Sequence, residues 1–77
     1  MTHIPHDLAA EFPGKAERIH ALKAADAHFA RLVTDYDAVN RLIHRAEQRL
    51  ELMSEEEEEH LRRRRVHLKD HIARHLR

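Results

Sequence analysis

The chain has 77 residues, of which 14 are Lys or Arg, 14 are Asp or Glu and nine are His, so its formal net charge is zero. It has no cysteine, which excludes disulfide bonds and thiolate metal sites. With 36% charged residues, one glycine and two prolines, the composition is typical of long helices. There is no run of about 18 apolar residues, and the first 12 residues do not resemble a secretory signal. We therefore expect one cytoplasmic domain over residues 1–77 with no membrane span.

A short helical pattern in residues 6–12 predicts an N-terminal helix that stops at Pro13-Gly14, because proline does not fit inside a helix. From residue 15 to residue 52 no glycine or proline interrupts the chain, and apolar residues recur in two series spaced by seven. This repeat predicts a long helix over about 15–52 with coiled-coil-like packing. A kink near Asp26 is not settled by the pattern. The two series are Leu22, Phe29, Tyr36, Ile43, Leu50 and Ala25, Leu32, Val39, Ala46, Met53.

A second helix is predicted over about 54–76. Ser54 and Glu57 have the spacing of a capping box, in which each side chain bonds a free backbone amide of the first turn. Glutamates then lie near the positive end of the helix dipole and arginines follow them, so the acidic and basic runs stabilise the helix itself. A short turn between the two helices makes an all-α antiparallel helical hairpin.

The second helix is too short to cover the first helix beyond about residue 30. Ile19, Leu22 and much of Phe29 are left uncovered, and exposed apolar side chains at heptad spacing call for a partner. Either the segment before Asp26 bends back onto the hairpin, or two hairpins dock. The second arrangement is favoured, so we expect a homo-oligomer or a protein partner. The expected interface consists of Ile19, Leu22, Phe29, Leu32, Tyr36, Val39 and Ile43.

His67, His71 and His75 recur every fourth residue and form a stripe on the second helix. The first and last lie about 12 Å apart along the axis, so one helix offers two ligands to an ion, and a zinc site needs at least three. A second copy could supply another pair. The stripe is therefore read as a metal-responsive assembly, a pH-sensitive surface, or a solvated helix face with adventitious affinity for zinc, nickel or copper. No resident cofactor is expected.

The charge is unevenly distributed, because residues 60–77 carry seven Lys or Arg and one Asp while residues 1–59 carry an excess of acid. This basic segment suggests a nucleic acid or ribosome as an alternative partner, through Arg62, Arg63, Arg64, Arg65 and Lys69. Four consecutive arginines point around the whole helix, and no aromatic stacking surface accompanies them. Catalysis is not expected, since the chain has no phosphate-binding glycine loop, no cysteine nucleophile and no concave site between two helices.

The sequence resembles the YdcH family, small bacterial cytoplasmic proteins of unknown function, over nearly the whole chain. The resemblance lies in Glu11-Phe12-Pro13, Ile19, Leu22-Lys23, Asp26, Phe29, Leu32, Tyr36, Asn40, Ile43, Glu47, Arg65, Leu68, Lys69, Asp70 and Ile72. It implies a helical hairpin with no catalytic residue to transfer. Relatives often carry proline where Ala27 stands, and the nine histidines exceed the family pattern. The expected function is a self-associating or partner-binding module without catalytic activity.

Overall fold

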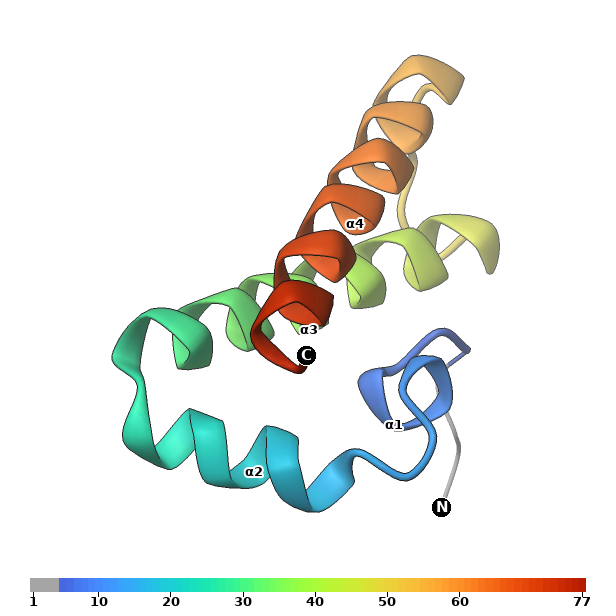
Figure 1. Ribbon diagram of the computed structural model, residues 1–77. Helices are drawn as coiled ribbons and strands as arrows, with labels where there is room; N and C mark the ends of the chain where they lie inside the picture. Colours follow the sequence, from blue (N-terminus) through green and yellow to red (C-terminus); the bar gives the residue numbers. More distant parts are fainter. Residues whose placement is uncertain (1–4) are drawn as a thin grey trace.

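The computed structural model describes residues 5–77, and all regular structure in this range is helical (Figure 1). The helices are α1 (Leu8–Glu11), α2 (Ala16–Ala25), α3 (Ala27–Glu47) and α4 (Glu55–His75). The two long helices, α3 and α4, pack against each other, and α2 packs against α3. The prediction of an all-α fold with a short N-terminal helix is confirmed.

The helices α3 and α4 run in opposite directions, as their side-chain contacts show. Arg62, near the start of α4, contacts Glu47 at the end of α3, whereas His75 at the end of α4 packs on Phe29 at the start of α3. Their shared core contains the largest fully buried side chains of the described range, namely Tyr36, Phe29, Ile43 and Ile72. Three of these belong to one heptad series, so the repeat identifies the core face of α3 correctly.

The prediction of one helix over about 15–52 is wrong at two points. The chain breaks at Asp26, whose backbone is extended (φ −133°, ψ 108°) and whose carboxylate accepts hydrogen bonds from the amides of His28 (2.9 Å) and Phe29 (3.1 Å). Asp26 is thus the N-cap of α3, a role that aspartate fills well because its oxygen satisfies amides that the helix leaves free. At the other end α3 stops at Glu47, and Arg49 adopts a left-handed conformation (φ 59°) in the connection to α4.

The break at Asp26 lets α2 turn back along the hairpin (Figure 1). Ile19 of α2 is only 8% exposed, Leu22 packs against the core, and Leu8 of α1 is buried in the same cluster. The chain therefore covers the start of α3 with its own N-terminal segment, which is the arrangement that the sequence analysis ranked second. We call residues 5–25 the N-terminal arm.

The second helix begins as predicted. Ser54 is the N-cap of α4, and its hydroxyl accepts a hydrogen bond from the amide of Glu57 at 3.1 Å. Four glutamates occupy the first turn, and Arg74 and His75 lie in the last turn, so both ends complement the helix dipole. The helix ends at His75, one residue before the predicted boundary.

Candidate functional site

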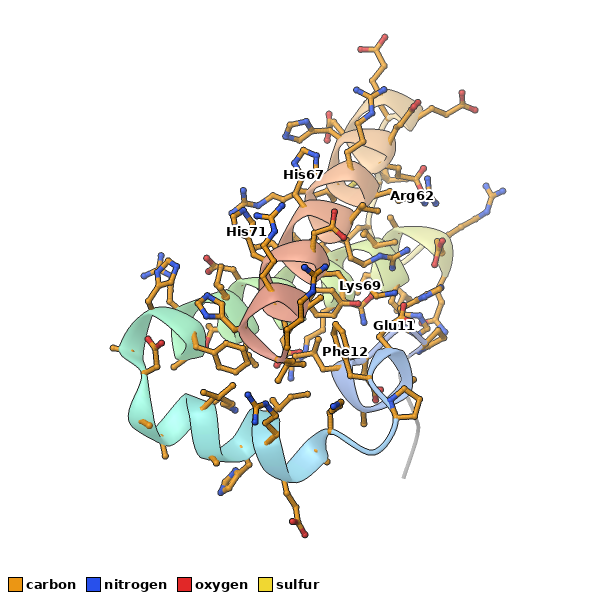
Figure 2. The ribbon with its side chains drawn as sticks, in the orientation of Figure 1. Glu11, Phe12, Arg62, His67, Lys69 and His71 are labelled. Atoms are coloured by element: carbon orange, nitrogen blue, oxygen red, sulfur yellow. The ribbon has the colours of Figure 1, made fainter. Side chains whose placement is uncertain are left out.

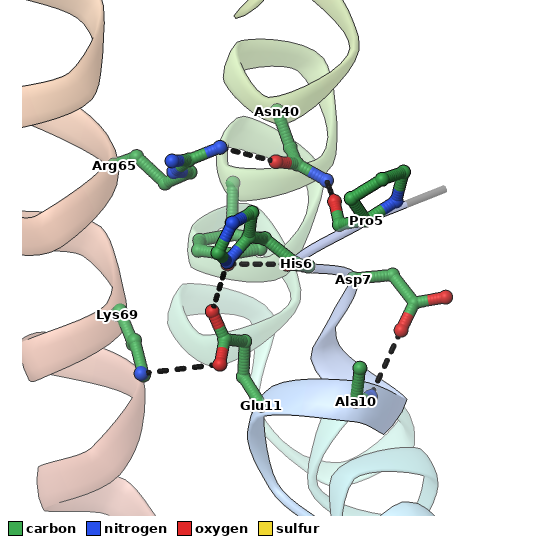
Figure 3. Close-up of polar contacts among 9 residues, drawn as sticks. Pro5, His6, Asp7, Ala10, Glu11, Asn40, Arg65 and Lys69 are labelled. Carbon is green, nitrogen blue, oxygen red and sulfur yellow. Dashed lines mark hydrogen bonds and ion pairs between the residues drawn. The ribbon is translucent and has the colours of Figure 1, made fainter. Parts of the chain in front are cut away.

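The N-terminal arm is held to the hairpin by a group of polar contacts that we call the clasp (Figure 3). The hydroxyl of Tyr36 donates to the backbone carbonyl of His6 at 2.6 Å, and the amide nitrogen of Asn40 donates to the carbonyl of Pro5 at 3.0 Å. Asn40 is only 3% exposed, and its oxygen accepts from the guanidinium of Arg65 on α4 at 2.9 Å. Two buried side chains of α3 thus donate hydrogen bonds to backbone carbonyls that lie about 30 residues earlier in the chain.

A second part of the clasp is ionic. The ring nitrogen Nδ1 of His6 lies 2.8 Å from one carboxylate oxygen of Glu11, and Nζ of Lys69 lies 3.4 Å from the other. The Lys69 ammonium also lies 6.0 Å from the centre of the Phe12 ring. Figure 2 shows Lys69 on the side of α4 that faces Glu11 and Phe12. Glu11 therefore joins the arm to α4 as well as stabilising the turn at His6, which has a positive φ of 64°.

The clasp shifts the acidity of two of its members. The hydrogen bond from His6 lowers the pKa of Glu11 below 4.5, and Lys69 adds to this effect against the opposing cost of burial. Burial raises the pKa of Tyr36 to about 12, and the nearby charge of Glu11 reinforces the shift. The phenol is therefore a neutral donor at physiological pH, as its bond to the His6 carbonyl requires.

A shallow groove of about 590 Å³ runs between α3 and α4 on another face of the molecule. Histidines from both helices line it, together with Asp35, Arg63 and Arg64; the histidines are His28, His60, His67 and His71. Figure 2 shows His67 and His71 projecting from the side of α4 that lies away from the arm. The groove thus contains two of the three predicted metal ligands.

The third predicted ligand, His75, does not line the groove, although it contacts His28 at the edge of it. Its ring packs edge-on against Phe29 at 5.5 Å and against His28 at 5.8 Å, measured between ring centres. Within residues 5–77, no three His, Asp or Glu side chains are arranged to hold one metal ion. The structure thus brings His67 and His71 to one groove without completing a ligand set.

Most of the predicted nucleic-acid residues have partners within the chain. Arg62 contacts Glu47 (3.1 Å) and Glu58 (3.5 Å), and Arg63 contacts Glu59 (2.9 Å). Arg65 and Lys69 belong to the clasp. Of the five predicted residues, Arg64 alone has neither an ion pair nor a side-chain hydrogen bond within residues 5–77.

The seven residues predicted to form an intermolecular interface lie inside this single chain. Six are buried, and Leu22 is packed against the same cluster at intermediate exposure. Of the four large apolar side chains that are exposed in residues 5–77, three lie in or near the connection between α3 and α4, and the fourth, Val66, lies on α4. We call the three, together with the partly buried Met53 and Leu61, the loop-end patch; it consists of Leu42, Leu50, Leu52, Met53 and Leu61.

In the loop-end patch, Leu52 is 99% exposed and Leu50 is 63% exposed. Leu42, Met53 and Leu61 line a groove of about 490 Å³ whose polar wall includes Glu56 and Glu57. Met53 connects the two parts of the patch, because it also lines a second hollow together with Leu52. Sequence reasoning missed this patch because Leu50 and Met53 continue the heptad series and were assigned to the core. Leu52 lies outside both series, but so do the buried Ile19 and Val33, so the spacing alone did not mark it as exposed.

The geometry defines a small all-helical protein built on an antiparallel pair of long helices. Residues 29–76 match the model of the family described as "Protein of unknown function (DUF465)", and the chain belongs to that family. The match begins at Phe29, the first buried residue of α3, and covers the hairpin without the N-terminal arm. Neither a curated protein nor a solved structure matches the chain significantly. None of the helices in residues 5–77 combines the length and apolar character needed to cross a bilayer.

Proposed function

We propose that this chain is a non-catalytic, YdcH-type protein-binding module whose docking surface is the loop-end patch. The observation that carries the proposal is the nearly complete exposure of Leu52, with Leu50 largely exposed beside it in the sequence. Burying a leucine side chain is worth about 2 kcal/mol, and an apolar patch rimmed by polar groups is a common mark of a protein interface. A partner that covers both leucines would gain several kcal/mol from them alone.

The charge around the patch specifies the partner further. Four of the seven glutamates in residues 41–61 are paired with arginines, whereas Glu55, Glu56 and Glu57 form no ion pair within residues 5–77, so they give this end of the hairpin an acidic rim. Complementary charge increases the rate and specificity of association. The partner is therefore a protein whose docking surface combines apolar side chains with a basic rim.

The placement of the other candidate residues supports this choice over the alternatives. Tyr36 and Asn40 are occupied by the clasp, and Arg62, Arg63, Arg65 and Lys69 by ion pairs or hydrogen bonds within the chain. Binding nucleic acid through these basic residues would require several of those contacts to be exchanged for phosphate contacts. The leucines of the loop need no rearrangement.

Photo-crosslinking tests the proposal. A benzophenone amino acid is placed at Leu52, and in a matched control at Val66, which is 55% exposed on α4. In living cells we expect the position-52 variant to give a discrete adduct with another protein, and Leu50→Ser to weaken it. The same adduct from position 66, an adduct that Leu50→Ser leaves intact, or adducts with this chain alone would refute the assignment.

A further inference from the structure

The break between α2 and α3 involves a single residue. Helix α2 ends at Ala25 and α3 begins at Ala27, so Asp26 alone separates them. The apolar repeat continues through this break in register, since Leu22 is followed by Phe29 and Ala25 by Leu32, each seven residues later. The sequence around Asp26 is thus compatible with a straight helix as well as with the observed turn.

Local features at Asp26 support both the bent and the straight conformation. Asp26 still completes α2, because its amide donates to the carbonyl of Leu22 at 2.8 Å, and it also caps α3 through His28 and Phe29. The residues on either side of it are alanines, the best helix formers. A straight helix would lose the cap and would pair the free amides of α3 with the free carbonyls of α2. No proline stands at this point to prevent it.

Straightening at Asp26 would move the arm away from its own hairpin. Leu8 and Ile19 would lose their apolar cover, and the clasp would lose both backbone carbonyls that Tyr36 and Asn40 hold. All of these contacts join residues 5–25 to α3 or α4. A second copy of the chain offers the identical hairpin surface, so every lost contact can form again between two chains.

We infer that the chain forms a domain-swapped dimer, in which Asp26 straightens and the N-terminal arm of each copy docks on the α3–α4 hairpin of the other. The helix then runs from Ala16 to Glu47, about 48 Å at 1.5 Å per residue. The two such helices lie antiparallel, because α2 turns back along α3 within the single chain (Figure 1). Exchange of an identical element is a low-cost route to a dimer, since it creates no new interface chemistry.

Two substitutions at the hinge push the equilibrium in opposite directions. Asp26→Ala removes the N-cap of α3 from the monomer, in which the chain turns at Asp26. The equilibrium constant between the bent and the straight conformation then shifts about fivefold towards the straight helix at each hinge, and the two hinges of a dimer lower its dissociation constant about 30-fold. Ala27→Pro occupies the first position of α3, where proline is well tolerated. In a straight helix the same proline would be an interior residue and would disfavour the dimer by on the order of 100-fold per hinge. Asp26→Asn is the matched control, since asparagine caps as well as aspartate.

The experiment measures solution mass by light scattering over a range of protein concentrations, with helicity checked by circular dichroism. The chain mass is 9.1 kDa. We expect Asp26→Ala to reach twice this mass at about 30-fold lower concentration than the wild type and Asp26→Asn. We expect Ala27→Pro to keep its helicity and stay at 9.1 kDa throughout. An Asp26→Ala variant that stays monomeric, or an Ala27→Pro variant that dimerises like the wild type, would overturn the inference.

Cross-linking distinguishes a swapped dimer from two closed chains that merely touch. Because the chain has no cysteine, Glu11→Cys and Lys69→Cys together introduce one reactive pair across the clasp. In an Asp26→Ala background, a short bis-maleimide should join two chains in the swapped dimer. A dimer whose links all lie within single chains contradicts the exchange. Leu52→Ser should leave this equilibrium unchanged, so a failure of the loop-end proposal and a failure of the swap give separate results.

Discussion

The hydroxyl of Tyr36 provides a direct test of the clasp. Tyr36→Phe keeps the buried ring in place and removes the 2.6 Å hydrogen bond to the carbonyl of His6. A hydrogen bond in a protein contributes about 1 kcal/mol net to stability. Because His6 is exposed, its carbonyl can bind water once the hydroxyl is removed, so Tyr36→Phe should destabilise the docked arm by about this amount. Opening of the arm should therefore become about fivefold more frequent.

Amide hydrogen exchange followed by NMR measures this opening. The amides of Glu11 and Phe12 donate to the carbonyls of Asp7 and Leu8 within the arm, so they exchange when the arm opens. Both should exchange about fivefold faster in Tyr36→Phe, with unchanged rates in the middle of α4. Thr34→Ala, at an exposed position of α3, is the control. Unchanged rates at Phe12, or equal acceleration throughout α4, would refute the role of this bond.

The same phenol gives a pH dependence. The pKa of Tyr36 is raised to about 12 in the folded chain from its ordinary value of 10.0, so the folded state holds the phenolic proton more tightly than the unfolded state does. Its contribution to stability is complete below pH 10 and is lost as the pH rises towards 12. The free energy of unfolding of the wild type should therefore fall over this window by more than that of Tyr36→Phe. Parallel curves would show that the phenol carries no such linkage.

Four further predictions concern single sites. Burial raises the pKa of Asp37, so the ionised carboxylate destabilises the folded chain. Asp37→Asn should therefore raise the Tm measured by calorimetry at pH 7, where Asp37 is ionised, but not at pH 3. The pKa of Glu11 is lowered, so its stabilising contribution is present above about pH 4.5 and is lost at lower pH. Glu11→Gln should therefore lower the Tm at pH 7 and make the Tm less dependent on pH in the acid range. Ser54→Ala removes the cap of α4 and should cost about 1 kcal/mol, or roughly 4–8 °C in Tm; an unchanged Tm would contradict the cap. Within residues 5–77 no third ligand completes a metal site with His67 and His71, so the wild type should have the same Tm in equimolar zinc as in EDTA, and His67→Ala with His71→Ala should reduce only its retention on immobilised nickel.

Local sequence signals predicted much of the fold. Ser54 and the glutamates after it marked the start of α4 because a cap acts on the backbone within its own turn. The spacing of Phe29, Tyr36 and Ile43 marked the buried face of α3, since packing along a helix repeats with its geometry. In both cases the sequence pattern and its structural cause lie within a few residues of each other.

The end of α3 illustrates what such signals miss. Residues 48–53 contain neither glycine nor proline, and Leu50 and Met53 continue the heptad. The helix nevertheless stops at Glu47, where Arg62 of α4 meets the last turn, and Arg49 adopts a positive φ that non-glycine residues rarely accept. Tertiary packing ends α3 here, because the chain has to turn so that α4 can pack on α3. No residue type in the connection is a sequence signal for this turn.

The clasp was out of reach for a related reason. Tyr36 and Asn40 bond to backbone carbonyls, and a carbonyl has no residue identity from which a sequence could reveal it. The residues that carry the family resemblance include five members of the clasp, namely Glu11, Tyr36, Asn40, Arg65 and Lys69. Resemblance thus singled out residues whose physical role became clear only when the arm was placed against the hairpin.

The break at Asp26 connects the sequence pattern to the inferred assembly. The seven-residue spacing of apolar side chains continues unchanged across Asp26. If the chain always turned at Asp26, α2 and α3 would bury their apolar faces as separate helices, and no common spacing would be required. In a swapped dimer the same residues would lie on one continuous helix. Ile19 and Leu22 would then pack on the α3 of a second chain through the contacts they make within one chain. The apolar set that the sequence marks as an interface therefore serves equally as the core of the monomer, and the conformation of Asp26 decides between the two.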